Sequence, residues 1–390
     1  MKVAAGGWIV ALLLAGCAAS TTSGVATGEP PQAPSTLEGV VPHTLVLRDF
    51  RLKNGVVMPE VVVAYETYGR LAADGRNAVL ISHGNTSTFH VAGRYATGQA
   101  PPHVPPQSPG WWDAIVGPGK AFDTHRYFVV SSNMLGGAYG TTGPRSVNPA
   151  TGKPYGPAFP DIALEDMVAV QRALLESLGV KHLVAAAGPS YGGFLTFQWG
   201  ITYPDMVDGL VVVVSAPDGG ANPQAIRNIE AQLARDPNWN GGDYYDRGGI
   251  LAAMTELRVA TLKAYGLDAQ LTPEYPDAQQ RAAEIRRRAE AWAREFDGNS
   301  LIVQRKAQEF RRQSRDFNRI RAKVLYVLST TDKLFPTRIA PRVMGQLRDA
   351  GVEATYFELV SSKGHSGGTA DAAGFAPALS RFLATLPHQG

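Results

Sequence analysis

The sequence predicts an α/β fold in which a mostly parallel, doubly wound sheet is interrupted by a helical insertion. Apolar, β-branched runs are near-continuous, as in strands covered on both faces, and helical patterns alternate with them. One long segment, residues 218–319, has almost no strand pattern. With 390 residues, 44% of them hydrophobic and 18% charged, the chain can bury a large core.

Eight apolar runs bounded by Gly, Pro, Asn or Asp are the predicted strands. A helix is expected between Asp161 and Gly179, because Asp161 and Glu165 place negative charge at its start and glycine ends it. A second helical pattern covers 194–203. The predicted strands are 44–47, 61–65, 78–82, 127–131, 183–187, 210–214, 324–328 and 355–360.

This order of elements gives a domain organisation. The insertion, rich in Ala, Arg, Glu and Gln, is predicted to form a helical lid over the carboxyl edge of the sheet, with helical segments at 279–296 and 301–317. The predicted parts are a leader (1–17), a flexible tether (18–40), the first part of the core (41–217), the lid (218–319) and the second part of the core (320–390).

The N-terminus resembles a bacterial lipoprotein leader. Lys2 precedes a short apolar run and the sequence Leu14-Ala15-Gly16-Cys17, which predicts lipidation of Cys17 and attachment to a membrane by the acyl chains. A plain secretory signal with a chance cysteine is the alternative. Because Ala18 follows the cysteine, we expect a lipid-anchored protein of the bacterial cell envelope, at the periplasmic face of the outer membrane.

Charge and cysteine content exclude several classes of function. The net charge of +3 gives no global field for nucleic acid, and a single cysteine excludes an intrachain disulfide or a cysteine-based metal cluster. His83 and His90 fit a loop at least as well as a ligand pair, and no glycine-rich phosphate cradle is evident. We therefore expect no cofactor and no metal.

The sequence Gly188-Pro189-Ser190-Tyr191-Gly192 lies between a predicted strand and a predicted helix. A Gly-x-Ser-x-Gly turn in that context is typical of a nucleophile elbow, in which the glycines allow a sharp turn that exposes the serine hydroxyl. The pattern alone is weak in a chain with 42 glycines. Its position between strand and helix makes Ser190 the predicted nucleophile.

A serine hydroxyl needs a base and an orienting acid, on loops after later strands in the order serine, acid, histidine. Asp332 follows strand 324–328 and His365 follows strand 355–360. Alone, they would be interpreted as a turn aspartate and an unimportant loop histidine. The order of the three predicts a catalytic triad, an order that Asp113, Asp123 and His125 do not have.

An oxyanion needs two backbone donors, one after the nucleophile and one from the loop after an earlier strand. Tyr191 supplies the first, and Asn85 in the loop 82–86 is the predicted second. Tyr191 and Trp112 are candidates to line the acyl pocket, with core packing as the stronger alternative for Trp112.

Five blocks of sequence carry a resemblance to a known family. They are VVVAYETYG (61–69), HVAGR (90–94), PGWWDAIVGPGKAFDTHRYFVVSSNMLGGAYGTTGP (109–144), NPATGKPYGPAFP (148–160) and DPNWNGGDYY (236–245). Over residues 45–386 the chain resembles homoserine O-acetyltransferases of the α/β-hydrolase superfamily. The resemblance implies an α/β-hydrolase fold, a helical lid that often mediates dimerisation, a ping-pong reaction through an acyl-serine, and the triad Ser190, Asp332 and His365.

The positions that recognise homoserine depart from the family. Ser366 stands where members usually have an aspartate for the amino group, and Ala253 and Glu230 align with arginines. A zwitterion in a partly desolvated pocket needs both of its charges matched. Homoserine and acetyl-coenzyme A are also cytosolic metabolites, whereas the leader predicts export.

The sequence therefore favours a serine hydrolase that cleaves small-molecule carboxylic esters. The alternative is an O-acyltransferase with the same acyl-serine mechanism, and a third hypothesis is an envelope scaffold on a retired enzyme fold. The expected partners are an acyl ester and a membrane, with a homodimer through the lid implied by the resemblance.

Overall fold

The computed structural model describes residues 37–101, 108–219, 222–309 and 311–387. Cys17, the leader and most of the predicted tether lie outside these residues. The tether was expected to extend to residue 40, but Val40 is buried and its N–H donates to the carbonyl of Arg94 (2.9 Å). The folded part of the chain therefore begins before residue 41.

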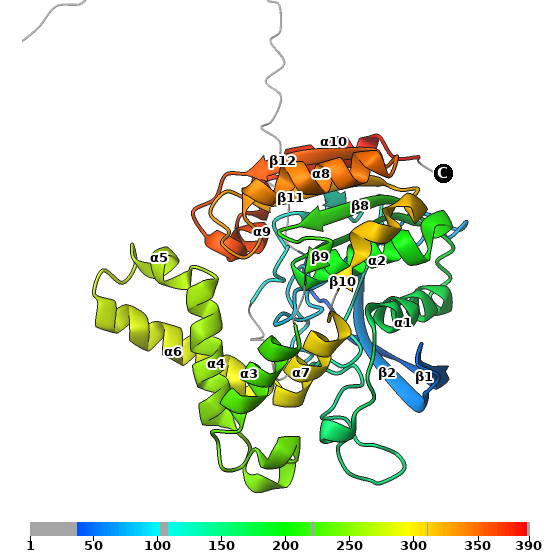
Figure 1. Cartoon of the computed structure of the whole chain (residues 1–390). Coiled ribbons are helices and arrows are strands. Elements are labelled where there is room, and N and C mark those ends of the chain that lie inside the picture. The colour runs from blue at the N-terminus through cyan, green and yellow to red at the C-terminus, as the bar shows by residue number, and fades with distance from the viewer. Residues whose placement is uncertain (1–36, 102–107, 220–221, 310, 388–390) are drawn as a thin grey trace, which may run out of the picture. The chain divides into compact units, whose positions relative to one another are not determined.

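An eight-stranded sheet forms the centre of the molecule (Figure 1). β1 and β2 pair antiparallel, β2 pairs antiparallel with β6, and the remaining pairs are parallel. All eight predicted strands are in this sheet. In spatial order they are β1 (His43–Arg51), β2 (Val57–Tyr68), β6 (Phe128–Ser132), β3 (Ala78–Ser82), β7 (Leu183–Pro189), β8 (Val207–Val213), β11 (Lys323–Ser329) and β12 (Ala354–Leu359).

Helices cover both faces of the sheet. Successive strand residues accordingly alternate between two hydrophobic clusters, one on each face. In β3, Leu80 belongs to one cluster and Ile81 to the other. The first cluster contains residues of α1 (Leu164–Ser177), α2 (Tyr191–Thr202) and α8 (Ala340–Asp349), and the second contains residues of α10 (Ala376–Ala384). This two-sided burial explains why most strands are near-continuously apolar.

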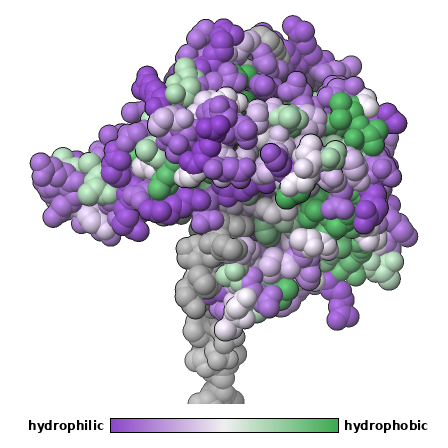
Figure 2. Space-filling model, turned by 90° about the horizontal axis from the view of Figure 1, so that it is seen from below, coloured by the Kyte–Doolittle hydropathy of each residue, from purple (hydrophilic) through white to green (hydrophobic). Residues whose placement is uncertain are grey.

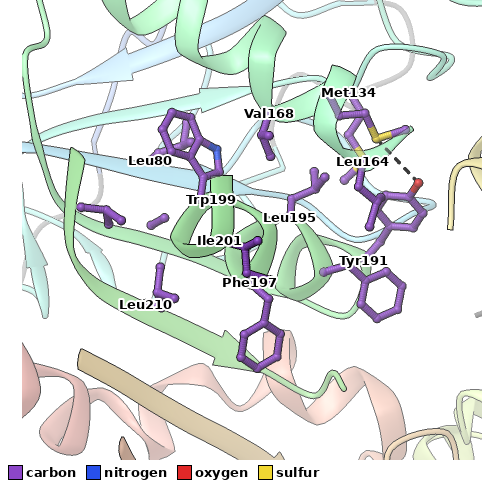
Figure 3. Packing of buried hydrophobic residues seen from close by; sticks show 14 of the residues in the cluster. Leu80, Met134, Leu164, Val168, Tyr191, Leu195, Phe197, Trp199, Ile201 and Leu210 are labelled. Carbon is purple, nitrogen blue, oxygen red and sulfur yellow. Dashed lines mark hydrogen bonds between the residues drawn. The ribbon is translucent and has the colours of Figure 1, made fainter. Parts of the chain in front are cut away.

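α2, the helix after the predicted nucleophile, is buried along almost its whole length. Figure 3 shows Leu195, Phe197 and Trp199 extending from different sides of this helix into the surrounding packing. Because its residues are held on several sides, the start of α2 provides a rigid support for Ser190.

The segment between β8 and β11 is mainly helical and has its own small cores. The predicted helix 279–296 corresponds to α6, but the predicted helix 301–317 is wrong. The helix observed in this segment is α7, which ends well before residue 317. Arg311 then lies in a short antiparallel pair of strands, where its guanidinium donates to the carbonyls of Ala216 and Pro217. The elements are α3 (Pro223–Leu233), α4 (Leu251–Ala264), α5 (Leu267–Leu271), α6 (Ala278–Glu295), α7 (Gly298–Ala307), β9 (Asp218–Gly219) and β10 (Arg311–Arg312).

The remaining short elements lie in the loops around the sheet. They are β4 (Val116–Gly117), β5 (Phe122–Asp123) and α9 (Gly367–Ala370). None of the helices in the described ranges combines the length and apolar character that crossing a bilayer requires.

The surface is mainly hydrophilic on the face shown in Figure 2, with hydrophobic side chains gathered at one edge. Within the described residues, no strongly exposed large hydrophobic side chain lies on α3 to α7. The predicted homodimer through the lid stays a prediction. The exposed large hydrophobic residues are Val41, Val46, Val56, Val57, Val147, Leu334 and Val360.

Candidate active site

Ser190 occupies a sharp turn between β7 and α2, as the sequence predicted. Its backbone has φ 54° and ψ −115°, a conformation that costs a non-glycine residue about 1–3 kcal/mol. Two hydrogen bonds hold it there: the Ser190 N–H donates to Val213 (2.9 Å), and the Ser215 hydroxyl donates to the Ser190 carbonyl (2.7 Å). The surrounding chain therefore maintains a strained serine at the carboxyl end of a central strand.

The two glycines of the motif are required by close contacts with β3. A Cβ atom at Gly188 would lie 2.6 Å from the Ser82 carbonyl oxygen, and one at Gly192 would lie 2.1 Å from it. Both distances are too short for a real side chain. The Gly-x-Ser-x-Gly pattern thus reflects the approach of the turn to the neighbouring strand.

His365 and Asp332 form a buried pair, with Nδ1 of the imidazole 2.8 Å from Oδ2 of the carboxylate. Oδ1 of Asp332 accepts hydrogen bonds from the N–H groups of Leu334 (2.8 Å) and Phe335 (3.2 Å). These donors keep the carboxylate oriented. With Nδ1–H donating to Asp332, the neutral imidazole has a free lone pair on Nε2.

The loops that carry Asp332 and His365 are tied together by Thr331. Its hydroxyl donates to the Ser361 carbonyl (2.8 Å) and accepts from the N–H of Gly364 (2.9 Å). These bonds join the loop after β11 to the loop after β12. The acid and the histidine are thereby held as a unit.

Ser190 and His365 line the same small cavity, of about 130 Å³. No hydrogen bond joins the Ser190 hydroxyl to His365 in the described residues, which is common in enzymes without bound substrate. The cavity is lined by Gly84, Asn85, Thr86, Ser87, Trp111, Pro189, Ser190, Val214, Tyr265, His365, Ser366 and Thr369.

A second, larger cavity of about 510 Å³ also has Ser190 in its wall. Asn85 and Tyr191 line it as well, whereas His365 does not. Ser190 therefore lines two cavities of unequal size, and of these two only the smaller has the imidazole in its wall.

The two predicted oxyanion residues lie beside Ser190 and are held by one glutamine of α7. The Asn85 amide donates to Oε1 of Gln304 (2.8 Å), and the Tyr191 hydroxyl donates to the Gln304 carbonyl (3.0 Å). Tyr191 begins α2, where backbone N–H groups have no partner within the helix. Such N–H groups are suited to bind a developing negative charge.

His83, at the start of the Asn85 loop, is a structural histidine. Its Nδ1 lies 2.7 Å from the Gly84 carbonyl oxygen, and its Nε2 lies 2.9 Å from the side-chain oxygen of Asn133. Burial lowers the pKa of His83 to about 4, so the ring is neutral near pH 7. In the described residues, no group of three or more His, Cys, Asp or Glu side chains could hold a metal ion.

Several other sequence candidates lie away from both cavities. Trp112 is fully buried in the core and donates to the Gly368 carbonyl (2.9 Å), so its neighbour Trp111 is the one that lines the small cavity. Ala253 and Glu230 line neither cavity, whereas Ser366 lines the small one. The departures at Ala253 and Glu230 thus lie outside the two cavities around Ser190.

Sequence reasoning missed the two aromatic residues that pack on His365. The ring of Tyr265, just after α4, lies 4.9 Å from the imidazole, and the ring of Phe335 lies 5.6 Å from it. Phe335 could have been suspected from its position three residues after Asp332. Nothing in the sequence around Tyr265 distinguishes it from an ordinary aromatic residue at a helix end.

The family of the α/β hydrolase fold matches residues 77–367, which includes β3, the elbow and the loop with His365. This match covers most of the chain. The chain belongs to the α/β-hydrolase family. It is an enzyme of the esterase or acyltransferase kind within that family.

Sequence relatives of this α/β-hydrolase are homoserine O-acetyltransferases, as the resemblance implied. The protein from Moorella thermoacetica is 36% identical over 348 residues, which is 80% of this chain and 88% of the relative. The protein from Haemophilus influenzae is 37% identical over 332 residues, which is 80% of this chain and 89% of the relative. The chain is thus a homoserine O-acetyltransferase-like member of the family.

Solved structures similar to this α/β-hydrolase include both kinds of enzyme. The crystal structure of an esterase superposes with a TM-score of 0.80 at 29% identity, covering 88% of this chain and 100% of the esterase. The homoserine O-acetyltransferase from Bacillus anthracis gives a TM-score of 0.78 at 27% identity, covering 89% and 98%. The fold alone therefore does not decide the acceptor of the acyl group.

Proposed function

We propose that this protein is a serine acyl-transfer enzyme in which Ser190 carries the acyl group. One observation carries the proposal: the oriented Asp332–His365 pair opens on the same cavity as a serine held at a nucleophile elbow. This arrangement supplies a nucleophile, a base and an acid that fixes the base. In enzymes without bound substrate, the hydrogen bond between nucleophile and base is often long or absent and forms when the substrate binds.

The reaction begins when Nε2 of His365 takes the proton of the Ser190 hydroxyl. The serine oxygen forms a bond to the carbonyl carbon of the donor ester, and the electron pair of the carbonyl moves to its oxygen. Backbone N–H groups of Asn85 and Tyr191 bind this oxyanion. When the C–O bond to the alcohol breaks, His365 gives its proton to the leaving oxygen, and the acyl group stays on Ser190.

The acceptor then removes the acyl group by the reverse sequence, with His365 again as the base. The curated relatives favour a hydroxyl compound as the acceptor, which makes the protein an O-acyltransferase. This ranks the transferase above the hydrolase that the sequence alone favoured.

Water as the acceptor is the second candidate, and the lining of the small cavity favours it. No carboxylate is among the described residues that line this cavity, and Ser366 stands beside the histidine. The ammonium group of an amino-acid acceptor would therefore be left without a partner, which is costly in a partly desolvated site. An esterase structure is also among the similar solved structures.

Incubation of the purified protein with a simple acyl ester, with and without a candidate alcohol, tests the acceptor. For an O-acyltransferase, we expect acylated alcohol to form faster than free acid. Free acid as the main product at saturating alcohol would assign the protein to the esterases. Ser190→Ala should abolish both products, and a variant that kept either activity would contradict the acyl-serine.

We also propose that Cys17 carries the lipid that anchors the protein in the cell envelope. The lipobox-like sequence before this cysteine supports the proposal. A small-molecule acyl ester is the proposed partner of the site.

A further inference from the structure

The larger cavity beside Ser190 has an excess of positive charge in its wall. Arg305, Arg311 and Arg342 line it, and Asp218 is the carboxylate among its described lining residues. Arg342 pairs with Asp218 at 3.3 Å. Within the described residues, no ion pair joins Arg305 or Arg311 to a carboxylate, although Asp218 lies near enough to Arg311 to oppose the lowering of its pKa by burial.

Arg305, in the last turn of α7, has no ion pair or side-chain hydrogen bond to any other described residue. Its Nε atom is buried and has no partner. Arg305 is half-buried, and a buried N–H group without an acceptor costs free energy that a ligand able to accept its hydrogen bond would recover. The missing acceptors of Arg305 point to a ligand in the cavity.

Arg311 is held in place by neutral groups. Its guanidinium donates to the carbonyls of Pro217 (3.0 Å) and Ala216 (3.0 Å) and stacks on the ring of Phe194 at 3.4 Å. Carbonyls orient the group but leave its charge in place. Burial lowers its pKa to about 10, so the side chain is still cationic near pH 7.

The carboxylate of Asp218 is already engaged. It accepts hydrogen bonds from the Ser314 hydroxyl (2.6 Å), the Ser314 N–H (3.0 Å) and the Gln346 amide (3.1 Å), in addition to the bond from Arg342. These four hydrogen bonds occupy the carboxylate, and within the described residues it forms no ion pair with Arg305. The charge of Arg305 is left for a ligand to match.

The position of His365 decides which half of a substrate enters this cavity. The leaving alcohol takes its proton from His365, so it must lie in the small cavity, the one with the imidazole in its wall. The acyl half must then extend into the larger cavity, past Tyr191 toward Arg305.

We propose that the acyl group carries a terminal carboxylate, which Arg305 binds together with the positive field of Arg311. The substrates are then monoesters of straight-chain dicarboxylic acids. This inference rests on the proposed acyl-serine and holds for either acceptor, because it concerns the acyl half alone. The acyl-transfer step is unchanged, and the distal carboxylate takes no part in bond making.

The test compares two matched esters, the monoethyl ester of a dicarboxylic acid and the same ester with the free carboxylate replaced by a carboxamide. Chains with two to six methylenes between the carbonyl groups are used, and ethanol release is measured. At the best length, we expect the carboxylate to have about a 10- to 100-fold higher kcat/KM, as for a charge-assisted hydrogen bond.

Arg305→Gln should lower this carboxylate-to-carboxamide ratio about tenfold or more, and Arg305→Lys should restore part of it. Lys306→Gln is the matched control, because Lys306 is the next residue of α7, is exposed and does not line this cavity. The Lys306→Gln variant should have the same carboxylate-to-carboxamide ratio as the wild type. A ratio that Arg305→Gln leaves intact would overturn the proposal.

Two further measurements separate this inference from the proposed function. An acetate ester of a hydroxy acid puts the carboxylate on the alcohol side, and a preference for that ester over the monoethyl esters would contradict the placement of the two halves. If no ester is turned over, the acyl-serine fails. Calorimetry with free adipate then tests the anion site, which must bind adipate more tightly in the wild type than in Arg305→Gln.

Discussion

The ring of Tyr265 packs 4.9 Å from the imidazole of His365, which places the helical insertion in contact with the predicted base. The Tyr265 carbonyl also lies so close to Gly364 that a Cβ there would approach it to 2.5 Å. The insertion also makes a hydrogen bond to the same loop, from the Gln270 amide to the Lys363 carbonyl (2.7 Å). The insertion therefore helps to position the histidine loop.

Tyr265→Ala should lower kcat about tenfold with a smaller change in KM, because the imidazole loses the ring that fixes its orientation. Tyr265→Phe keeps the ring and should restore kcat. Steady-state kinetics with a neutral ester measure both. Equal loss in the two variants would assign the effect to the hydroxyl and contradict a positioning role for the ring.

Asp332→Asn should lower kcat by about 10³- to 10⁴-fold while the protein stays folded. The amide occupies the space of the carboxylate, but it no longer holds the imidazole in the required tautomer or stabilises its charge. Ester turnover and circular dichroism measure the two effects. The control is Asp123→Asn, because Asp123 lies at the end of β5, lines neither cavity around Ser190 and should leave turnover intact when replaced.

Acid should destabilise the protein through His83. The pKa of His83 is about 4 in the folded protein, whereas the ordinary value for histidine is 6.5. Between these two pH values the unfolded chain therefore binds more protons than the folded one, so the free energy of unfolding decreases as the pH falls. At pH 4 the loss is on the order of 3 kcal/mol. Urea unfolding of the wild type and His83→Gln between pH 7 and 4 measures this loss of stability. An equal pH dependence in the two proteins would contradict a contribution from His83.

Ser366→Asp should improve the use of acceptors that carry an amino group. The new carboxylate would line the small cavity beside His365 and supply the missing partner for an ammonium ion. Transfer to an amino alcohol, measured against transfer to the alcohol without the amine, should rise about tenfold. Ser366→Asn is the matched neutral control and should give no such rise.

Cys17→Ala should release the protein from membranes into the soluble fraction of its host, because the acyl chains are lost with the thiol. Fractionation and metabolic labelling with a radioactive fatty acid measure anchoring directly. Label that persists in the Cys17→Ala protein would contradict lipidation at this residue.

The sequence predicted the sheet well because its strands are buried on both faces. The run 78–82 matches β3 at both ends, since Ala78 to Ser82 are all buried and the flanking residues break the pattern. The insertion was harder to predict. Arg311 follows a helical pattern in the sequence, but the carbonyls of Ala216 and Pro217 hold it in a short strand, and such distant contacts leave no local signal.

In the candidate site too, some residues could be predicted from the sequence and others could not. Ser190, Asp332 and His365 follow strands in the required order, so chain order alone could bring them to one edge of the sheet. Arg305 lies in a helix of the insertion and Tyr265 directly follows one, and the placement of these helices depends on packing between elements far apart in the chain. Local patterns do not predict which face of these helices meets the core.

Ser190 lines both a cavity of about 130 Å³ and one of about 510 Å³. With the roles proposed here, the first product leaves the smaller cavity while the acyl group, in the larger one, is still attached to Ser190. The order in which the two products leave is then set by the two cavities next to the hydroxyl oxygen of Ser190. An acceptor must occupy the space that the first product has just vacated, so its size is limited by the volume of the smaller cavity, however long the acyl chain becomes.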